Sequence, residues 1–281
     1  MGRVLSIFRA IFIIFDGKLV NNAARWIRIF GFSLQPSEFI RPALMVVSGY
    51  LISSESYFLA ISCCVLTSLV FLLQPDFGSA FLVISACAIQ MFCSEIPSRI
   101  KASISWVFAL CGVSLFGLIF LGYLPHVYSR ISNFLGGEIP YQTKVALSAI
   151  SSGGFFGSGI GDGVWKFRIP DASTDFIFAV IAEEGGIFTC VVLLLLYTII
   201  IQRGLLKVIR MRGDGDRYYL CIVGLLSLFA GQVAINISSC LALIPTKGFT
   251  LPFMSYGGSS LIASAWIIGL ILSMRCQDEY C

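Results

Sequence analysis

Long apolar runs separated by short polar segments fill most of the chain. A helix needs roughly 20 apolar residues to cross the hydrocarbon core of a bilayer. Runs of about this length predict seven spans, at 38–54, 57–73, 78–94, 104–124, 187–202, 218–243 and 257–274. An eighth run, residues 4–15, is shorter and contains Arg9, so it is expected to be either a signal peptide or the tail of a longer helix whose start is missing. No small-residue cleavage site follows it, which is against the signal peptide.

Composition agrees with this pattern. The 281 residues are 57% hydrophobic and 12% charged, with a mean hydropathy of +0.90, whereas soluble domains carry about 25% charged residues. The expected fold class is an all-α, polytopic integral membrane protein, formed by one transmembrane domain over residues 1–281. The net charge of +4 is too small to indicate a nucleic-acid partner. The ten cysteines lack metal-ligand spacing, and His126 is the single histidine.

Basic residues in the short loops predict the orientation. The segment 203–217 holds five of them, and Arg99 and Lys101 lie in another loop on the same predicted side. Both loops, together with Arg275, are expected to face the cytoplasm. The region 125–186 and the loop 244–256 then face the outside, and region 125–186 forms one large extracytoplasmic loop.

This large loop carries the densest polar sequence of the chain. Residues 141–186 are rich in glycine and contain several carboxylates and cations. Backbone of this kind cannot face lipid, because its amides would stay unpaired. The run GGFFGSGIGDG at 153–163 matches no phosphate-binding motif and predicts an irregular, flexible loop.

Asp175 is the candidate catalytic residue. It stands at the lip of an apolar segment, in STDFIFAVIAEE, where partial desolvation raises the pKa of a carboxyl group and makes it a better proton acceptor. The alternative is an ordinary cap for a helix that starts at Phe176. Helical spacing would place Glu183 near the same face, and Glu183 with Glu184 is equally well explained as an interfacial acidic cluster.

Two further sets of charges are candidates. Glu38 and Arg41 have the spacing of an ion pair on one helix face, and a structural pair is the preferred interpretation. The outward-facing cations could bind a phosphate or pyrophosphate, with lipid-headgroup anchoring as the alternative for each; they are Arg25, Arg130, Lys166, Arg168 and Lys247. A transporter and an enzyme acting on a lipid phosphate both remain open from these residues alone.

Several stretches resemble the SEDS family of cell-wall proteins, which includes FtsW, RodA and SpoVE. They are AARWIRIFGFSLQPSEFIRPAL at 23–44, LLQPDFGSA at 72–80, YQTKVALSAISSGGFFGSGIGDG at 141–163, IPDASTDFIFAVIAEEGG at 169–186 and GQVAINISSCLALIPTKGFTLPFMSYGGSS at 231–260. The last of them resembles the cell-division branch, FtsW, more than RodA. The family fold has ten helices, so the predicted spans correspond to helices four to ten, residues 4–15 to part of helix three, and helices one and two are missing.

The resemblance implies a peptidoglycan glycosyltransferase that polymerises lipid II into β-1,4 glycan strands during septal cell-wall synthesis. Asp175 falls on the family's essential aspartate and would be the general base. Arg25 falls on the arginine of the RW motif, Glu38 on the glutamate of QPSE, and Arg41 where the family usually has lysine. Arg130 matches a basic residue ahead of the large-loop motifs. The expected substrate-binding set is Arg25, Glu38, Arg41, Arg130, Lys166, Glu183 and Lys247.

The resemblance also implies partners and a location. The partners are lipid II, the undecaprenyl-pyrophosphate-linked glycan, a class B penicillin-binding transpeptidase and other divisome proteins. The location is the bacterial cytoplasmic membrane at the division septum. The resemblance establishes no cofactor, and the need for a divalent cation, Mg²⁺ or Mn²⁺, stays open. The chain departs from the family pattern at Ser173, at Asp171 and in LGGEIP at 135–140. A non-catalytic scaffold for the transpeptidase and a lipid II flippase are the alternative functions.

Overall fold

The computed structural model describes residues 18–20, 23–29, 32–74, 76–98, 101–102, 125–137, 139–213, 218–246 and 248–274. The predicted partial helix at 4–15 and the predicted span at 104–124 lie outside these residues. The chain divides into two compact units, Met1–Ser94 with Leu195–Val233 and Phe249–Cys281, and Glu95–Leu194 with Ala234–Gly248. We call them the first and the second unit. The single domain expected from the sequence stays a prediction.

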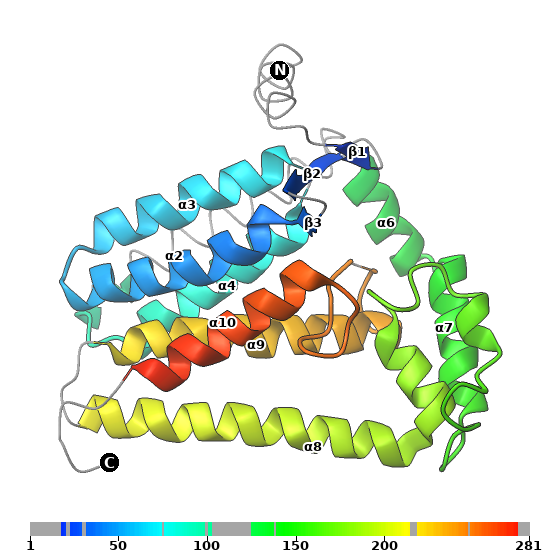
Figure 1. The fold of residues 1–281 in the computed structure, drawn as a ribbon. Coiled ribbons are helices and arrows are strands. Elements are labelled where there is room, and N and C mark those ends of the chain that lie inside the picture. The colour runs from blue at the N-terminus through cyan, green and yellow to red at the C-terminus, as the bar shows by residue number, and fades with distance from the viewer. Residues whose placement is uncertain are drawn as a thin grey trace. The chain divides into compact units, whose positions relative to one another are not determined.

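Helices make up most of the first unit. In chain order, α2 (Pro36–Ser53), α3 (Tyr57–Leu73) and α4 (Phe77–Cys93) lie side by side, and α10 (Gly258–Ser273) packs against α2 (Figure 1). Proline at the first position starts α2, where its missing amide costs nothing. Asp76 caps α4 through Ser79, whose amide and hydroxyl both donate to the Asp76 carboxylate, at 3.2 and 2.7 Å.

Two long helices each contribute to both units. Helix α8 (Ile177–Gly213) and helix α9 (Tyr219–Cys240) are the described helices that are long and apolar enough to cross a membrane, and α3, α4 and α10 are shorter apolar helices. Large apolar side chains remain exposed along them, such as Phe58 on α3 and Leu195 on α8. A surface of this kind is typical of a lipid-facing helix, and it agrees with the predicted membrane protein.

Six of the seven predicted spans coincide with described helices. The agreement is within two residues at the ends of α2, α3, α4 and α10, and within three at the ends of α9. Helix α8 differs most, because it begins ten residues before and ends eleven residues after the predicted span at 187–202. Its early part contains Glu183 and Glu184, which a search for purely apolar runs excludes. The backbone at Gly186 departs from helical geometry, with φ 66° and ψ −171°.

The fold is helical as predicted, except that residues 18–34 contain a small sheet that the sequence did not predict. Three short strands form an antiparallel sheet in the order β1 (Lys18–Val20), β2 (Ala23–Ile29) and β3 (Phe32–Leu34). Arg28 pairs with Ser33, and Ile29 with Phe32. The sequence AARWIRI of β2 contains the aromatic and β-branched residues that strands favour.

One buried amide joins three helices of the first unit. The side chain of Gln90 on α4 donates to the carbonyl oxygens of Met45 on α2, at 2.8 Å, and of Leu220 on α9, at 3.0 Å. It accepts a hydrogen bond from Ser48 at 2.7 Å. Gly224 leaves room for it, since a Cβ there would lie 2.2 Å from Nε2 of Gln90. The hydrogen-bonding capacity of this amide is therefore used without exposure to lipid.

Replacement of Gln90 by alanine is expected to destabilise the fold by about 1–2 kcal/mol, because three hydrogen bonds in an apolar environment are lost. Thermal unfolding in detergent measures the change. Gln202→Ala is the matched control, since Gln202 is exposed on α8, and it should leave the midpoint unchanged. Equal midpoints for Gln90→Ala and the wild type would contradict the structural role of this amide.

Candidate active site

The second unit contains the large loop. This unit is built from α6 (Pro125–Leu135), α7 (Tyr141–Ser152), the short 3-10 helix η1 (Trp165–Phe167), the start of α8 and the end of α9 (Figure 1). Residues 153–164 contain no regular helix or strand, so the irregular structure predicted for the glycine run is confirmed. Its predicted flexibility stays a prediction.

A tight turn carries Asp175. The carbonyl oxygen of Asp171 accepts hydrogen bonds from the amides of Thr174 and Asp175, each at 3.1 Å. Asp171 itself has φ 55°, a conformation that aspartate and asparagine tolerate better than most residues. Phe176, next to Asp175, is 4% exposed, and burial of its ring in the core fixes the exit of the turn.

Helix α9 anchors this turn from the other side. The carbonyl oxygen of Asp175 accepts a hydrogen bond from Nδ2 of Asn236 at 2.9 Å and from Sγ of Cys240 at 3.6 Å. Asn236 and Cys240 are one helical turn apart and both are fully buried. The main chain of Asp175 is therefore fixed by α9, while its side chain stays available for another partner.

The carboxylate of Asp175 is partly buried and receives no hydrogen bond from the residues that the structure describes. Desolvation, followed by repulsion from the nearby Asp171, raises the pKa of Asp175 to about 6. Gly248 adjoins it, and a Cβ at Gly248 would lie 3.0 Å from Oδ2 of Asp175. A carboxylate with this pKa is ionised at neutral pH and is a stronger base than an exposed aspartate.

The predicted helical spacing between Asp175 and Glu183 needs correction. Helix α8 begins at Ile177, so Asp175 precedes it and the helical spacing to Glu183 does not apply. Glu183 is 2% exposed and accepts hydrogen bonds from the amides of Trp165, at 2.7 Å, and Lys166, at 3.0 Å. Its carboxylate thus holds the 3-10 helix η1 against α8.

A partly buried ion pair between Lys166 and Glu184 also attaches η1 to α8. The ammonium of Lys166 lies 2.6 Å from the carboxylate of Glu184 and donates to the carbonyl oxygen of Gly161, also at 2.6 Å. Gly163 allows the close approach, because a Cβ there would lie 2.9 Å from the carboxyl carbon of Glu183. Lys166 and Glu183, both predicted to bind substrate, have partners within the loop itself.

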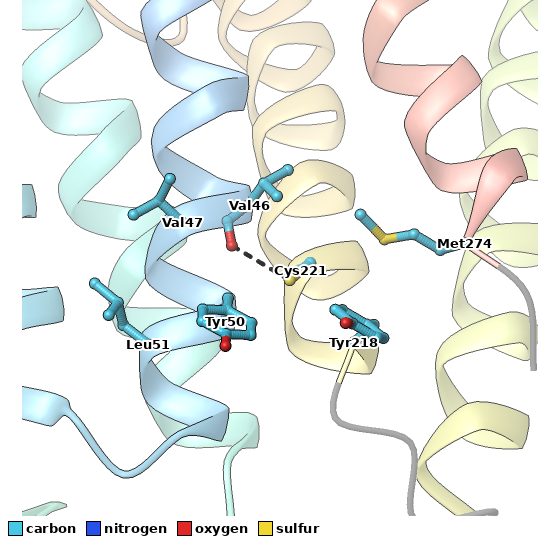
Figure 2. Close-up of a pocket in the computed structure, with 7 residues that line it drawn as sticks. All are labelled: Val46, Val47, Tyr50, Leu51, Tyr218, Cys221 and Met274. Carbon is cyan, nitrogen blue, oxygen red and sulfur yellow. Dashed lines mark hydrogen bonds between the residues drawn. The ribbon is translucent and has the colours of Figure 1, made fainter. Parts of the chain in front are cut away.

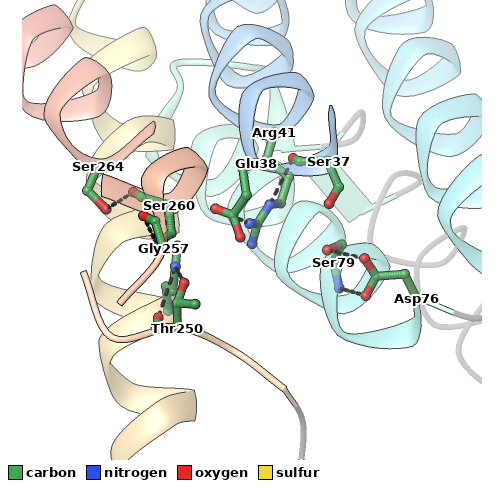
Figure 3. A network of polar contacts seen from close by, with 10 residues as sticks. Ser37, Glu38, Arg41, Asp76, Ser79, Thr250, Gly257, Ser260 and Ser264 are labelled. Atoms are coloured by element: carbon green, nitrogen blue, oxygen red, sulfur yellow. Dashed lines mark hydrogen bonds and ion pairs between the residues drawn. The ribbon is translucent and has the colours of Figure 1, made fainter. Parts of the chain in front are cut away.

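Glu38 and Arg41 form the predicted ion pair in the first unit. Their side chains lie 2.7 Å apart and are almost fully buried. Nε of Arg41 also donates to the carbonyl oxygen of Ser37 at 3.1 Å, and the guanidinium lies 5.5 Å from the ring centroid of Phe249. Figure 3 shows the pair on α2, with Ser260 and Ser264 on the neighbouring helix α10. Within the described residues, Nη1 of Arg41 has no hydrogen-bond partner.

The structure brings few of the other predicted residues together. Arg130 is exposed on α6. Arg25 belongs to β2, and its side chain lies outside the description, as does Lys247. Asn236 was missed by the sequence analysis, although an isolated amide within an apolar helix is a recognised signal of a functional or structural role.

Replacement of Glu183 by alanine is expected to free η1 from α8, because the amides of Trp165 and Lys166 lose their acceptor. Hydrogen exchange of these amides should become at least about ten-fold faster, which corresponds to a loss of about 1.4 kcal/mol in local protection. Glu184→Ala is the matched control, since it removes the partner of the Lys166 side chain and of the Gly161 and Gly163 amides but keeps the acceptor of the Trp165 and Lys166 amides. Unchanged exchange in Glu183→Ala would rule out the clamp.

Replacement of Asp171 by asparagine is expected to lower the pKa of Asp175 from about 6. A neutral neighbour no longer repels the ionised carboxylate, while desolvation remains, so the pKa should still lie above that of an exposed aspartate. Infrared titration of the carboxyl band that Asp175→Asn removes measures it. Asp162→Asn should leave this titration unchanged, and a pKa that does not move in Asp171→Asn would contradict the assigned repulsion.

Comparisons with known proteins agree with the motifs. The family of cell cycle proteins that comprises FtsW, RodA and SpoVE matches residues 2–280. The "Probable peptidoglycan glycosyltransferase FtsW" of Caulobacter vibrioides is 37% identical over 277 residues, which cover 92% of this chain and 67% of the relative. Stage V sporulation protein E of Bacillus subtilis is 33% identical, with 99% of this chain and 78% of the relative covered.

Solved structures show the same similarity. A chain from a structure on the coordination of polymerization and crosslinking by a peptidoglycan synthase complex has a TM-score of 0.75 and 26% identity, with 96% of this chain and 78% of that chain covered. The rod shape determining protein RodA of Thermus thermophilus has a TM-score of 0.61 and 25% identity, with 96% and 74% covered. The chain therefore belongs to the FtsW, RodA and SpoVE family of cell cycle proteins.

Proposed function

We propose that this protein is a peptidoglycan glycosyltransferase that polymerises lipid II in the cytoplasmic membrane during septal cell-wall synthesis, with Asp175 as its general base. The observation that carries the assignment is the carboxylate of Asp175. It is partly desolvated, has a pKa of about 6, and belongs to a turn that α9 holds by the main chain. The names of the relatives from Caulobacter vibrioides and from other bacteria support this activity.

The proposed step is a single displacement. Asp175 accepts the proton of the acceptor sugar's 4-hydroxyl group as its oxygen attacks the anomeric carbon of the lipid-linked donor. The bond between this carbon and the pyrophosphate oxygen breaks, and undecaprenyl pyrophosphate leaves with the electron pair. Because the oxygen attacks from the face opposite the leaving pyrophosphate, the configuration at the anomeric carbon inverts. The α-linked donor therefore gives a β-1,4-linked product. No second carboxylate is needed as a nucleophile, unlike in retaining glycosidases.

Charge on the leaving pyrophosphate requires cations rather than a general acid. Arg25, Arg130 and Lys247 remain the proposed binding residues, and the buried pair of Glu38 and Arg41 is proposed to support the binding of lipid II from within the first unit. Among the described residues, no three His, Cys, Asp or Glu side chains converge on one point. No step is therefore assigned to a divalent cation.

The proposal extends to the partner and the orientation. The similar chain from the peptidoglycan synthase complex belongs to an assembly that couples polymerization to crosslinking. It supports a class B penicillin-binding transpeptidase as the partner of this chain. The basic segment 203–217 supports an orientation with the large loop on the extracytoplasmic side, where lipid II is polymerised.

Replacement of Asp175 by asparagine is expected to lower the rate of lipid II polymerisation by about 10²–10⁴-fold, the usual contribution of a general base. Glycan chains made by the purified protein with its transpeptidase measure the rate, and Asp162→Asn serves as a control of equal charge change. The wild-type rate should fall below a pH of about 6, because Asp175 is then protonated and cannot accept a proton.

The same experiment separates the alternative functions. Wild-type polymerisation by Asp175→Asn would refute the assigned base. Absence of product from the wild type and every variant, with the transpeptidase still bound, would favour the scaffold. Lipid II translocation into vesicles that needs Glu38 and does not need Asp175 would favour the flippase.

A further inference from the structure

A concave site lies in the first unit, and its lining contains none of the residues to which a role is assigned above. It is an apolar groove of about 480 Å³ between the C-terminal half of α2, the start of α9 and the residue that follows α10. We call it the lateral groove. Figure 2 shows its lining, which consists of Val46, Val47, Tyr50, Leu51, Tyr218, Cys221 and Met274. Its volume falls within the range of about 300–1,000 Å³ that is usual for small-molecule sites.

Direct contact between two backbones forms the base of the lateral groove. Gly49 has no side chain, and a Cβ at this position would lie 2.7 Å from the amide nitrogen of Cys221. Sγ of Cys221 donates to the carbonyl oxygen of Val46 at 3.3 Å. Helices α2 and α9 are therefore held together beneath the groove, while the walls stay open. The exposed fractions are 47% for Val47, 53% for Tyr50 and 48% for Tyr218.

The groove lies at the cationic end of the first unit. The last turns of α8 carry Arg203, Lys207, Arg210 and Arg212. Lys207 ties this end to the groove, since its ammonium donates to the carbonyl oxygens of Ile271 and Leu272 at 2.7 and 3.1 Å, just before Met274. By the positive-inside rule this end faces the cytoplasm, whose membrane leaflet is rich in anionic lipids.

The size of the groove argues against a protein helix as the occupant. A helix is about 10–12 Å wide and rises about 5.4 Å per turn, so 480 Å³ accommodates roughly one turn. Packing of two helices involves several turns. A flexible hydrocarbon chain fits a short, apolar groove of this kind. Tyrosine rings such as Tyr50 and Tyr218 favour the depth at which chain and headgroup meet.

We propose that the lateral groove binds an acyl chain of an anionic phospholipid from the cytoplasmic leaflet. The chain lies against Val47, Leu51 and Met274, and the tyrosine rings frame the point where it leaves the groove. The cations at the end of α8 attract the phosphate of the headgroup. Bound lipid fills the lateral groove between α2 and α9. This site is independent of the polymerisation proposed for Asp175.

Native mass spectrometry of the full chain tests the proposal with phosphatidylglycerol and phosphatidylcholine as probes. The wild type should retain one phosphatidylglycerol molecule in preference to phosphatidylcholine. Val47→Trp, which fills the groove, should weaken this binding at least about ten-fold, because the excluded chain loses its buried methylene groups. Leu59→Trp is the matched control, since Leu59 is 53% exposed on α3 away from the groove, and it should bind as the wild type does.

Two further experiments test the role of the cations on α8 and the identity of the molecule in the lateral groove. The double replacement of Arg210 and Arg212 by glutamine should reduce the preference for phosphatidylglycerol. A photoreactive residue at position 47 should form adducts of lipid mass in native membranes. Wild-type lipid binding by a folded Val47→Trp variant, equal retention of the two lipids by the wild type, or adducts with a second protein or a second copy of the chain would each overturn the proposal.

Discussion

A polar group inside an apolar helix must find a partner within the protein, and this requirement organises the fold. Gln90 meets it by joining α4 to α2 and α9. Tyr197 on α8 meets it by donating to the carbonyl oxygen of Pro252 at 2.7 Å. Asn236 meets it by donating to the carbonyl oxygen of Asp175. These contacts connect segments that are distant in sequence. Apolar packing alone distinguishes little between one apolar helix and another in a membrane, so the polar contacts specify which helices are neighbours.

The same requirement gives Asp175 its chemistry. The protein fixes the turn at the carbonyl oxygens of Asp171 and Asp175, and it leaves the carboxylate of Asp175 without a hydrogen bond from the described residues. Burial and Asp171 then act against the ionised form. Glu183, eight residues later, shows the opposite arrangement, because two amides stabilise its carboxylate. The two carboxylates therefore differ in environment: that of Asp175 is desolvated and lies near Asp171, whereas that of Glu183 has two amide donors.

The sequence predicted most of the helices, because long apolar runs and their polar ends are local features. It also predicted the pair of Glu38 and Arg41, which depends only on helical spacing. It could not assign Glu183, whose partners lie at Trp165 and Lys166 and depend on how the glycine-rich loop folds back. The small sheet at 18–34 was missed because β1 and β3 have three residues each and the sequence AARWIRI of β2 does not alternate between apolar and polar residues. Asn236 was missed because its partner is a main-chain atom, which no side-chain motif records.

Helix α8 has a consequence for the thickness of the surrounding bilayer. The carboxylate of Glu184 and the amide of Gln202 mark its polar limits, and the regular helix of residues 187–201, after the break at Gly186, rises about 22 Å at 1.5 Å per residue. The hydrocarbon core of a typical bilayer is about 30 Å thick. Lipids next to α8 must therefore shorten their chains by several ångströms, or its polar ends must be drawn inward. This hydrophobic mismatch costs least in thinner regions of membrane.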